Sequence, residues 1–324
     1  MTRGSVAGPL EPDEVAVLLR AATSAPSVHN AQPWQFGVAG DLVELHLDRD
    51  RVLPAADPAL REVILSCGAA LAGLRLAMTH LGYQPRVTLQ PDPRDADHLA
   101  DVRRGAPRKP TAEQERLYAA LFTRRMHRRP FADRPVRPQA VTELMRTARG
   151  HGSWAHEVRG QPERRLVADV AASSAGRLLA DPAYRAELTA WTRRDRRSGD
   201  GLLLASLGEA PYPVNGVPWA LLGDPSVDEE SFARDVLLIV GTSTDTPRDW
   251  LVGGEALLQV LLNAVIRGLG ASLLTQALEV PDSRDRLVTA LRLPGPPQAL
   301  LRIGHPVDVV PATTRRPLEQ VLRS

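Results

Sequence analysis

The segment CGAALAGLRLAMTHLG (residues 67–82) has a counterpart later in the chain, GGEALLQVLLNAVIRG (residues 253–268). Both are apolar nearly all round at helical spacing, which is typical of a buried central helix. At a constant offset of 186 residues, identical residues stand at Gly68, Ala70, Leu71, Leu76 and Gly82 and at Gly254, Ala256, Leu257, Leu262 and Gly268. The match favours an internal duplication, and chance similarity between two apolar helices is the alternative.

The sequence before each of these segments extends the repeat. The helix expected after Pro12 resembles the one expected after Pro138, and each leads into a strand that contains a tryptophan. The connections differ, because the first is APSVHNAQP (residues 25–33) and the second only RGHGS (residues 149–153). We therefore expect two related α+β halves in one chain, an internal pseudo-dimer with one differentiated loop. The expected halves are residues 1–110 and residues 111–324.

Composition indicates the class of protein. The chain has 324 residues, 43% of them hydrophobic, which is enough for one large or two ordinary domains. Its formal charge of +2 is too small to indicate a nucleic-acid partner. The single cysteine, Cys67, excludes an intramolecular disulfide and a thiolate metal cluster. Without a secretory h-region or an apolar run of roughly 18 residues, a cytoplasmic protein with no membrane span is expected.

The connection APSVHNAQPWQF (residues 25–36) is stiff and polar. Its two prolines restrain their own backbone and that of the residues before them. Ser27, His29, Asn30 and Gln32 add hydrogen-bonding groups to this frame. Such a loop is either a well-capped turn or one wall of a ligand site. Taken alone, His29 is more often a surface or capping residue than a catalytic base.

A basic run, TRRMHRRPF (residues 123–131), follows an expected helix. The planar guanidinium groups of Arg124, Arg125, Arg128 and Arg129 suit bidentate binding of a phosphate. From composition alone, a solvated basic face is the commoner interpretation. A nucleic-acid site is the weakest interpretation, because the run lacks interleaved aromatic residues and a helix-turn-helix pattern.

The stretch GLGAS (residues 268–272) lies between an expected helix and an expected strand, ASLLTQALEV (residues 271–280). A dinucleotide fingerprint requires the reverse order and a third glycine, so the stretch predicts a helix C-cap glycine instead. Thr275 and Gln276 of the expected strand are candidates for facing a ligand.

Residues for catalysis by side chains alone are scarce. The sequence has no Gly-x-Ser-x-Gly elbow, and His151 and His156 lack the spacing of a helical zinc motif, so no metal site is expected. Cys67 lies on an all-apolar segment and is expected to be an inert core thiol. Scattered polar loops and arginines are typical of a protein whose bound cofactor carries the reaction.

Taken together, four stretches resemble motifs of the flavin-dependent nitroreductase superfamily. APSVHNAQPWQF is similar to its P-S-x-x-N-x-Q-P-W motif, and TRRMHRRPF to its Arg-Arg-Ser-x-Arg motif. Residues 267–306 resemble its helix–Gly-x-Gly–strand–helix–strand signature, and RRPLEQVL (residues 315–322) its closing Arg-Lys-Pro segment. The first motif precedes the arginines instead of following them. That order, with the repeat, resembles the fused, double-length Acg-type branch.

The resemblance implies a nitroreductase-like α+β fold, with two fused halves whose mixed or antiparallel sheets are flanked by helices. It also implies one FMN per chain. The residues that would contact or frame the flavin are Ser27, Asn30 and Gln32 at the ring or fixing the loop beside it, Arg124, Arg125, Arg128 and Arg315 at the phosphate and ribityl chain, and Gly270, Leu274 and Thr275 along the ring. Met126 stands where the motif has serine, which removes a hydroxyl contact, and Arg129 replaces Arg128 if the register shifts by one.

The implied activity is that of an FMN-dependent oxidoreductase. It would transfer hydride from NAD(P)H through the flavin to a small electron-poor acceptor such as a nitroaromatic or a quinone, with His29 as a candidate proton donor. The alternative is a non-catalytic protein that sequesters flavin under a lid formed by residues 196–230. A monomer is expected, with further dimerisation as the other option. The sequence names neither the acceptor nor a preference between NADH and NADPH.

Overall fold

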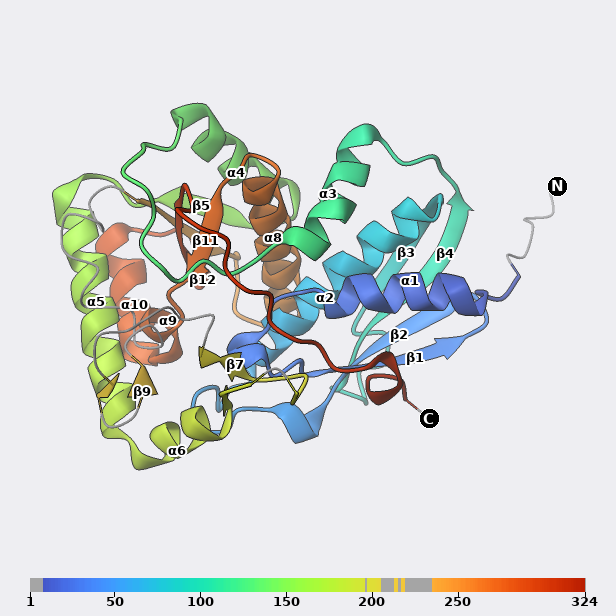
Figure 1. The fold of residues 1–324 in the computed structure, drawn as a ribbon, viewed down its shortest axis with the longest axis horizontal. Helices are drawn as coiled ribbons and strands as arrows, with labels where there is room; N and C mark the ends of the chain where they lie inside the picture. The colour runs from blue at the N-terminus through green and yellow to red at the C-terminus, as the bar shows by residue number, and fades with distance from the viewer. Residues whose placement is uncertain (1–7, 196, 205–212, 215–216, 219–234, 324) are drawn as a thin grey trace.

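The protein is described by a computed structural model that covers residues 8–195, 197–204, 213–214, 217–218 and 235–323. Two four-stranded antiparallel sheets lie on either side of a central pair of helices (Figure 1). The first sheet has the order β1-β2-β4-β3 and the second the order β5-β10-β12-β11. If the four strands of each sheet are numbered 1 to 4 along the chain, the strand order is 1-2-4-3 in both sheets. The two sheets therefore share one topology.

The first sheet belongs to the N-terminal part of the chain. Its strands and the helices packed on it are α1 (Pro12–Thr23), β1 (Trp34–Ala39), β2 (Leu42–Leu47), α2 (Arg61–His80), β3 (Tyr83–Leu89) and β4 (His98–Pro107). Next comes α3 (Ala112–Thr123), whose N-terminus has a capping box formed by Thr111 and Gln114. The helix α3 packs against α2 and α8, so it lies close to the junction between the two sheets.

The second sheet uses the same order of elements and adds further helices. The matching elements are α4 (Pro138–Gly150), β5 (Trp154–Glu157), β10 (Val236–Gly241), α8 (Pro247–Val265), β11 (Gly270–Leu273) and β12 (Pro297–Gly304). The additional helices are α5 (Gly160–Ala180), α6 (Pro182–Ala190), α9 (Gln276–Glu279) and α10 (Pro281–Leu291). Short strand pairs join β6 (Thr192–Arg193) to β7 (Leu202–Leu203) and β8 (Pro213–Val214) to β9 (Val217–Pro218).

The helices α2 and α8 cross at the two glycines of the repeat. A Cβ on Gly68 would overlap the backbone of Leu251, and a Cβ on Gly254 would overlap the backbone of Leu65. Leu65 and Leu251 are related by the same offset as the two glycines. The contact therefore has the reciprocal form of a two-fold interface. The α+β class is confirmed, and this contact is the one that a fused pair of halves would make. The boundary at residue 110 stays a prediction.

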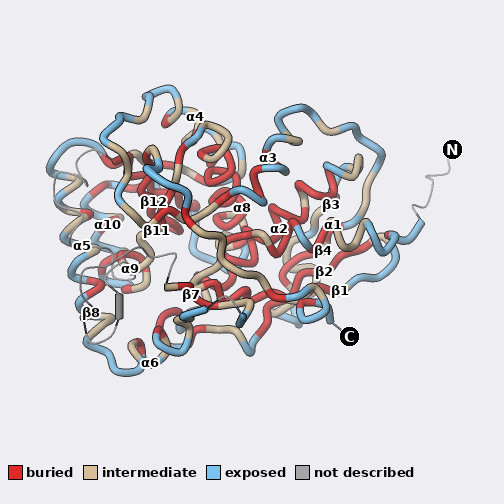
Figure 2. Tube along the Cα trace, in the orientation of Figure 1, coloured by how far each residue is buried: buried red, intermediate tan, exposed pale blue. Residues whose placement is uncertain are grey.

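The helix α2 forms the centre of the core, as Figure 2 shows by its buried colour. By length and composition it could cross a membrane, so the expectation of no sufficiently long apolar run was wrong. However, 89% of its apolar window is buried inside the fold, which is typical of a core helix. Cys67 on this helix is fully buried and its thiol donates to the Pro33 carbonyl, 3.1 Å away. Burial raises the pKa of this thiol, which suits an inert core residue.

The strand expected over residues 271–280 was wrong in its second half. The strand β11 ends at Leu273, and Thr275 is instead the residue before helix α9. The carbonyl of Gln298, on the neighbouring strand, accepts a hydrogen bond from Arg61 at 3.0 Å. The same buried guanidinium reaches the Leu278 carbonyl at 3.4 Å. In this register a longer strand would bring residues 277 and 278 opposite Pro297 and Pro296, which have no N–H to donate.

Two segments cross from one half to the other (Figure 1). After β12 the C-terminal segment returns to the first sheet, where the N–H of Arg323 donates to the Phe36 carbonyl at 2.8 Å. The segment after α3 crosses to the second sheet, where the N–H of His127 donates to the Ala271 carbonyl at 2.8 Å. Through these crossings the four motif-bearing stretches meet.

Candidate functional site

The loop between α1 and β1 holds an unusual backbone. His29, Asn30 and Gln32 have φ values of 48°, 53° and 54°, in the left-handed region that few residues other than glycine adopt. Each such residue costs of order 1–2 kcal/mol, so the loop keeps this shape only where surrounding contacts determine it. The two prolines expected to stiffen it are present at either end. The loop is strained as well as stiff.

The amide side chains of the loop are fully used in holding it. Asn30 donates to the carbonyls of Gly201 at 3.1 Å and Thr314 at 3.2 Å, and its Oδ1 accepts from Arg315 at 3.2 Å. Gln32 donates to the Gly199 carbonyl at 2.9 Å and accepts from the N–H of residue 316 at 2.9 Å. Of the two roles expected for Asn30 and Gln32, these contacts correspond to fixing the loop. They bind the loop to residues 199–201 and to the C-terminal segment.

Ser27 and Arg315 complete this framework. The Ser27 hydroxyl accepts the Gln32 N–H at 3.0 Å and so closes the loop on itself. Arg315 donates to the carbonyls of Thr23 at 2.6 Å, Ser24 at 3.3 Å and Ala25 at 3.1 Å. These carbonyls end helix α1, where the helix dipole favours a positive charge. Arg315 therefore caps α1 from the far end of the chain.

Arg124 is the most isolated cation of the group. It ends α3, is 5% exposed, and donates through Nη2 to the Ser24 carbonyl at 3.3 Å. Its Nε and Nη1 are buried without a partner among the described residues. Burial lowers its pKa to about 9, with further lowering from Arg315, Arg125 and Arg128. Arg124 and Arg315 thus share one carbonyl and repel each other.

The other three arginines of the basic run have different partners. Arg125 donates to the carbonyls of Phe122 at 2.9 Å and Arg124 at 2.7 Å. Arg128 is half-buried and lies close enough to His29 to affect its pKa, while burial lowers the pKa of Arg128 itself to about 10. Arg129 is instead ion-paired with Asp308. Because Arg128 lies near the loop and Arg129 is paired elsewhere, Arg128 is favoured as the third arginine of the motif.

Arg124, Arg125, Arg128 and Arg315 form a group of cations, hereafter the arginine cluster. Among the described residues, no carboxylate contributes to the pKa shifts of Arg124, Arg128 or Arg315. Burying cations without a counter-charge is costly, and an uncompensated buried charge is normally tolerated only where something pairs with it. An anion with several acceptor oxygens fits the orphaned Nε and Nη1 of Arg124.

The three residues expected along the ring lie at two places. Gly270 is beside the basic run, because a Cβ there would stand 3.2 Å from the His127 Cβ and 3.0 Å from the Phe131 ring. Leu274 and Thr275 lie just beyond the end of β11, where the Leu274 N–H donates to the Leu300 carbonyl at 2.9 Å. The structure therefore brings the arginine run and Gly270 together and places Leu274 and Thr275 at the other end of the same strand.

Beside Thr275 lies a buried acidic group that sequence reasoning missed. Thr275 hydrogen-bonds to Glu279, which lies near Glu62. Burial is the main cause that raises the pKa of Glu62 to about 8 and that of Glu279 to about 7. Nearby carboxylates contribute to the rise, Glu279 and Asp57 at Glu62 and Asp57 at Glu279. Arg61 is 2.6 Å from Glu62 and offsets part of this charge. A glutamate within the apolar run of α2 was the available signal.

Arg316, near the C-terminal end of the described chain, also holds the loop, and His29 within the loop has a lowered pKa. Arg316 donates to Asp48 at 3.1 Å and to the Gln32 carbonyl at 3.3 Å, so it holds the loop from the side of β2. Burial, with a smaller contribution from Arg128, lowers the pKa of His29 to about 4. At pH 7 this imidazole is neutral, so a proton-donor role would have to use the neutral ring N–H. That role stays a prediction.

Comparison with curated proteins identifies relatives of full length. The chain is 36% identical to the "Putative NAD(P)H nitroreductase Rv3131" of Mycobacterium tuberculosis over 96% of its own length and 91% of the relative's. It is 33% identical to the "Putative NAD(P)H nitroreductase acg" of the same species, over 95% of each chain. The chain belongs to the Acg-type branch of the nitroreductase family. The resemblance stated from the motifs is thereby confirmed.

Other comparisons add less to this nitroreductase-family chain. It is also 36% identical to the "Uncharacterized protein Rv3127" of M. tuberculosis, over 95% of this chain and 92% of the relative. No family model matches the sequence. Among solved structures, the nitroreductase-like family protein from Bacillus cereus is 16% identical, covers 68% of this chain and 98% of its own, and has a TM-score of 0.40. That score is too low to support an argument.

Proposed function

We propose that this chain binds FMN and oxidises NAD(P)H, passing the electrons to a small electron-poor acceptor. The observation that carries the proposal is the buried Arg124, whose Nε and Nη1 have no partner among the described residues, beside Arg128 and Arg315. Relatives at 33–36% identity are named NAD(P)H nitroreductases, which supports the same activity. Bound FMN would supply the hydride chemistry, because it accepts and releases hydride.

The residues would divide the work of holding the cofactor. Arg124 and Arg128 would bind the phosphate, since Arg124 has two buried nitrogens without partners and Arg128 is half-buried beside the loop. Asn30, Gln32 and Arg315 would act as positioning residues, because their polar groups already hold the loop in place. The loop and the strand end at Leu274 and Thr275 would flank the ring and exclude water.

The first experiment measures cofactor binding. Purified protein should absorb in the visible flavin range and release FMN in about one equivalent per chain. Arg124→Met should weaken FMN binding by roughly 10–100-fold, because hydrogen bonds to a charged group contribute about 1.5–3 kcal/mol. Arg129→Met is the matched control, since its partner is Asp308, and it should bind FMN as the unchanged protein does.

Riboflavin, which lacks the phosphate, sharpens this experiment. The unchanged protein should prefer FMN over riboflavin, and Arg124→Met should lose most of that preference. Equal binding of the two flavins by the unchanged protein would contradict the assignment of the arginine cluster. Turnover is measured separately, as NADPH and NADH oxidation with a nitroaromatic or quinone acceptor.

A second candidate function is flavin sequestration without turnover. It is favoured by the hydrogen bonds that Asn30 and Gln32 make to residues 199–201, at the start of the segment expected to be a lid. Most of residues 196–230 lies outside the described residues, so the lid itself stays a prediction. NADPH oxidation that appears only after deletion of residues 208–222 would support sequestration. Turnover by the full chain would contradict it.

We also propose that the chain acts as a monomer in the cytoplasm, on a small-molecule substrate and without nucleic acid. The reciprocal contact of Gly68 and Gly254 already joins the two halves internally, which supports the monomer. Size-exclusion chromatography with light scattering tests it.

A further inference from the structure

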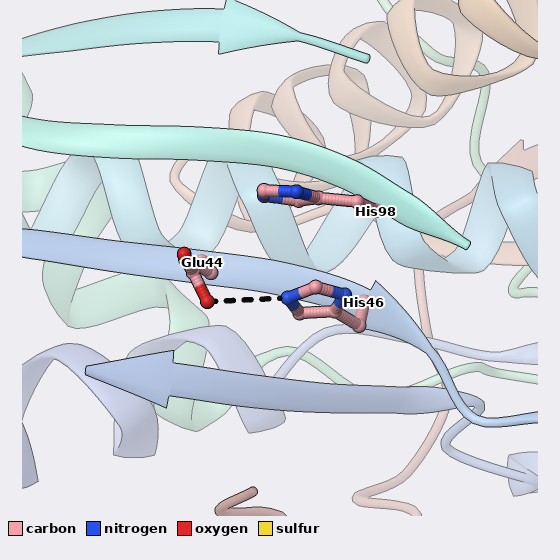
Figure 3. Close-up of side chains that lie close together, drawn as sticks. All are labelled: Glu44, His46 and His98. Carbon is pink, nitrogen blue, oxygen red and sulfur yellow. Dashed lines mark hydrogen bonds and ion pairs between the residues drawn. The ribbon is translucent and has the colours of Figure 1, made fainter. Parts of the chain in front are cut away.

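A second cluster of polar side chains lies on the outer face of the first sheet, away from the helices. Glu44 and His46 alternate along β2, and His98 and Asp101 stand on β4. In the strand register Glu44 lies opposite Asp101 and His46 lies opposite His98. Figure 3 shows Glu44, His46 and His98 projecting from the two neighbouring strands, with Glu44 linked to His46.

A β-bulge creates this arrangement. Leu45 is opposite Ala100 and the next residue, His46, is opposite His98, so Leu99 has no partner on β2. Leu99 and Ala100 are both fully buried. Without the extra residue, strict alternation would place His98 on the same side as Ala100, in the core. Bulges commonly redirect a side chain in this way next to functional sites.

The donor atoms of the cluster are close together. One ligand atom from each of Glu44, His46 and His98 lies within 4.8 Å of the other two. The Glu44 carboxylate is 3.3 Å from His46 Nε2, and Asp101 is 2.8 Å from His98 Nε2. The two imidazole rings stack with their centroids 4.3 Å apart. Two imidazoles and two carboxylates on one surface is a donor set that Zn²⁺ favours.

The position of Glu44 depends on a missing side chain. Gly37 lies opposite Glu44 on β1, and a Cβ there would stand 2.6 Å from Glu44 Oε2. The glycine therefore gives the carboxylate room to lie over β1, where it contacts His46 two residues further along β2. His46 is only 5% exposed, and its Nδ1 is buried without a partner among the described residues. A largely buried histidine whose hydrogen bonding is incomplete is unusual.

We propose that Glu44, His46 and His98 form a Zn²⁺ site, with Asp101 as the fourth ligand. Zinc holds nitrogen ligands at about 2.0–2.1 Å, so two of them lie at most about 4.2 Å apart, and the stacked rings must rotate to converge on one ion. When the ion binds, His98 Nε2 coordinates the metal instead of contacting Asp101. The Asp101 carboxylate then coordinates the same ion. The ion links β2 to β4 at the bulge and stabilises the first sheet.

The test uses tag-free, chelator-treated full-length protein and zinc chloride at pH 7.5. Calorimetry should show one saturable site per chain, and the melting temperature should rise with zinc, because a ligand that binds only the folded state stabilises it. His98→Gln, on a half-buried position, and His46→Gln should each weaken zinc binding at least tenfold. His80→Gln is the matched control, because His80 also pairs with a carboxylate, Glu115, but away from the cluster.

Gly37→Ala provides a variant that keeps every ligand. It should weaken zinc binding several-fold by displacing the Glu44 carboxylate, while circular dichroism shows the same fold without metal. Substitution of Co²⁺ for zinc should give the strong visible absorption of a tetrahedral site in the unchanged protein and lose it in His98→Gln. The proposal is overturned if the unchanged protein binds no stoichiometric zinc, or if His98→Gln binds it equally well.

Discussion

The loop after α1 and the loop after α4 occupy matching places in two sheets of the same topology, yet they are built very differently. The first carries three residues other than glycine at positive φ. Its amide side chains donate to the carbonyls of Gly199, Gly201 and Thr314, and Arg315 donates to Asn30. The second is a short turn in which Gly152, at φ 76°, supplies the left-handed position. One loop is strained and heavily braced, and the other uses the residue that adopts this backbone freely.

The charges near the two strand ends differ in the same way. The strand β3 corresponds to β11, and at β3 lies an open cavity of about 430 Å³ lined by Arg75, Pro85, Val87, Thr88, Leu89, Arg248 and Glu255. There Arg75 is paired with Glu255 at 2.7 Å. Near the first loop, by contrast, Arg124 has two buried nitrogens without a partner in the described part of the chain. In the described residues, the two halves therefore share a scaffold, while the strained loop and the unpartnered nitrogens of Arg124 lie at the first loop.

The contact shared by the two halves is the first target. Gly254→Leu should prevent folding, because its side chain would overlap the Leu65 backbone and overpacking at a backbone contact cannot be relieved locally. Soluble expression and circular dichroism measure this. Gly176→Ala in α5, where no atom lies within 4 Å, is the control and should stabilise the protein by about 0.5–1 kcal/mol. Normal folding of Gly254→Leu would refute the close crossing.

The bracing of the first loop is the second target. Asn30→Ala removes three hydrogen bonds and leaves alanine at positive φ, so it should lower the free energy of unfolding by about 2–4 kcal/mol. Urea denaturation measures the change. His151→Ala, at the matching loop, should change it by less than about 1 kcal/mol. Equal effects at the two loops would remove the contrast between them.

The buried acids near the first loop give the third prediction. Because burial raises the pKa of Glu62 to about 8, the folded state holds a proton that the unfolded state releases above its ordinary value near 4.5. The contribution of this proton to the free energy of unfolding is therefore complete below about pH 4.5. It decreases as the pH rises toward 8, by at most about 1.4 kcal/mol per pH unit for one proton. Glu62→Gln should flatten this slope in denaturation curves between pH 5 and 8.

The exposed Glu113→Gln is the control for this slope and should leave it unchanged. A pH-independent stability of the unchanged protein would show that the carboxyl pair is ionised in both states.

The smallest effect is expected on the surface of the second half. Arg177 and Asp282 join α5 to α10 at 3.3 Å, with side chains 56% and 82% exposed. Exposed ion pairs contribute about 0–1 kcal/mol, so Arg177→Ala should shift the urea midpoint only slightly and less at high salt. A loss as large as that of Asn30→Ala would mean that the second half is braced at its surface instead of at its loop.

Local patterns predicted most of the elements, because these depend on residues close in sequence. Apolar periodicity located α2 and α8. The strand expected over residues 271–280 was wrong beyond Leu273, where the partner strand would offer Pro297 and Pro296, which have no N–H.

The candidate site was predictable in its residues but not in their contacts. The motifs named the loop and the arginines, yet the partners of Asn30 lie at Gly201 and Thr314, which no local pattern connects to it. The donors Glu44, His46 and His98 were missed because they lie on two strands, and only the bulge turns His98 outward. The alternation of Glu44 with His46 in the sequence was the signal available.

The cap that Arg315 places on helix α1 has a consequence for synthesis. The loop after α1 leaves the ribosome early, whereas Arg315 emerges after nearly all of the described chain has been made. During that interval the strained residues lack the guanidinium that holds them and remain free to adopt ordinary backbone angles. A nascent chain therefore carries an open loop with no assembled site. Ligand binding should begin only once the last segment has crossed the molecule, which makes it a readout of completed folding.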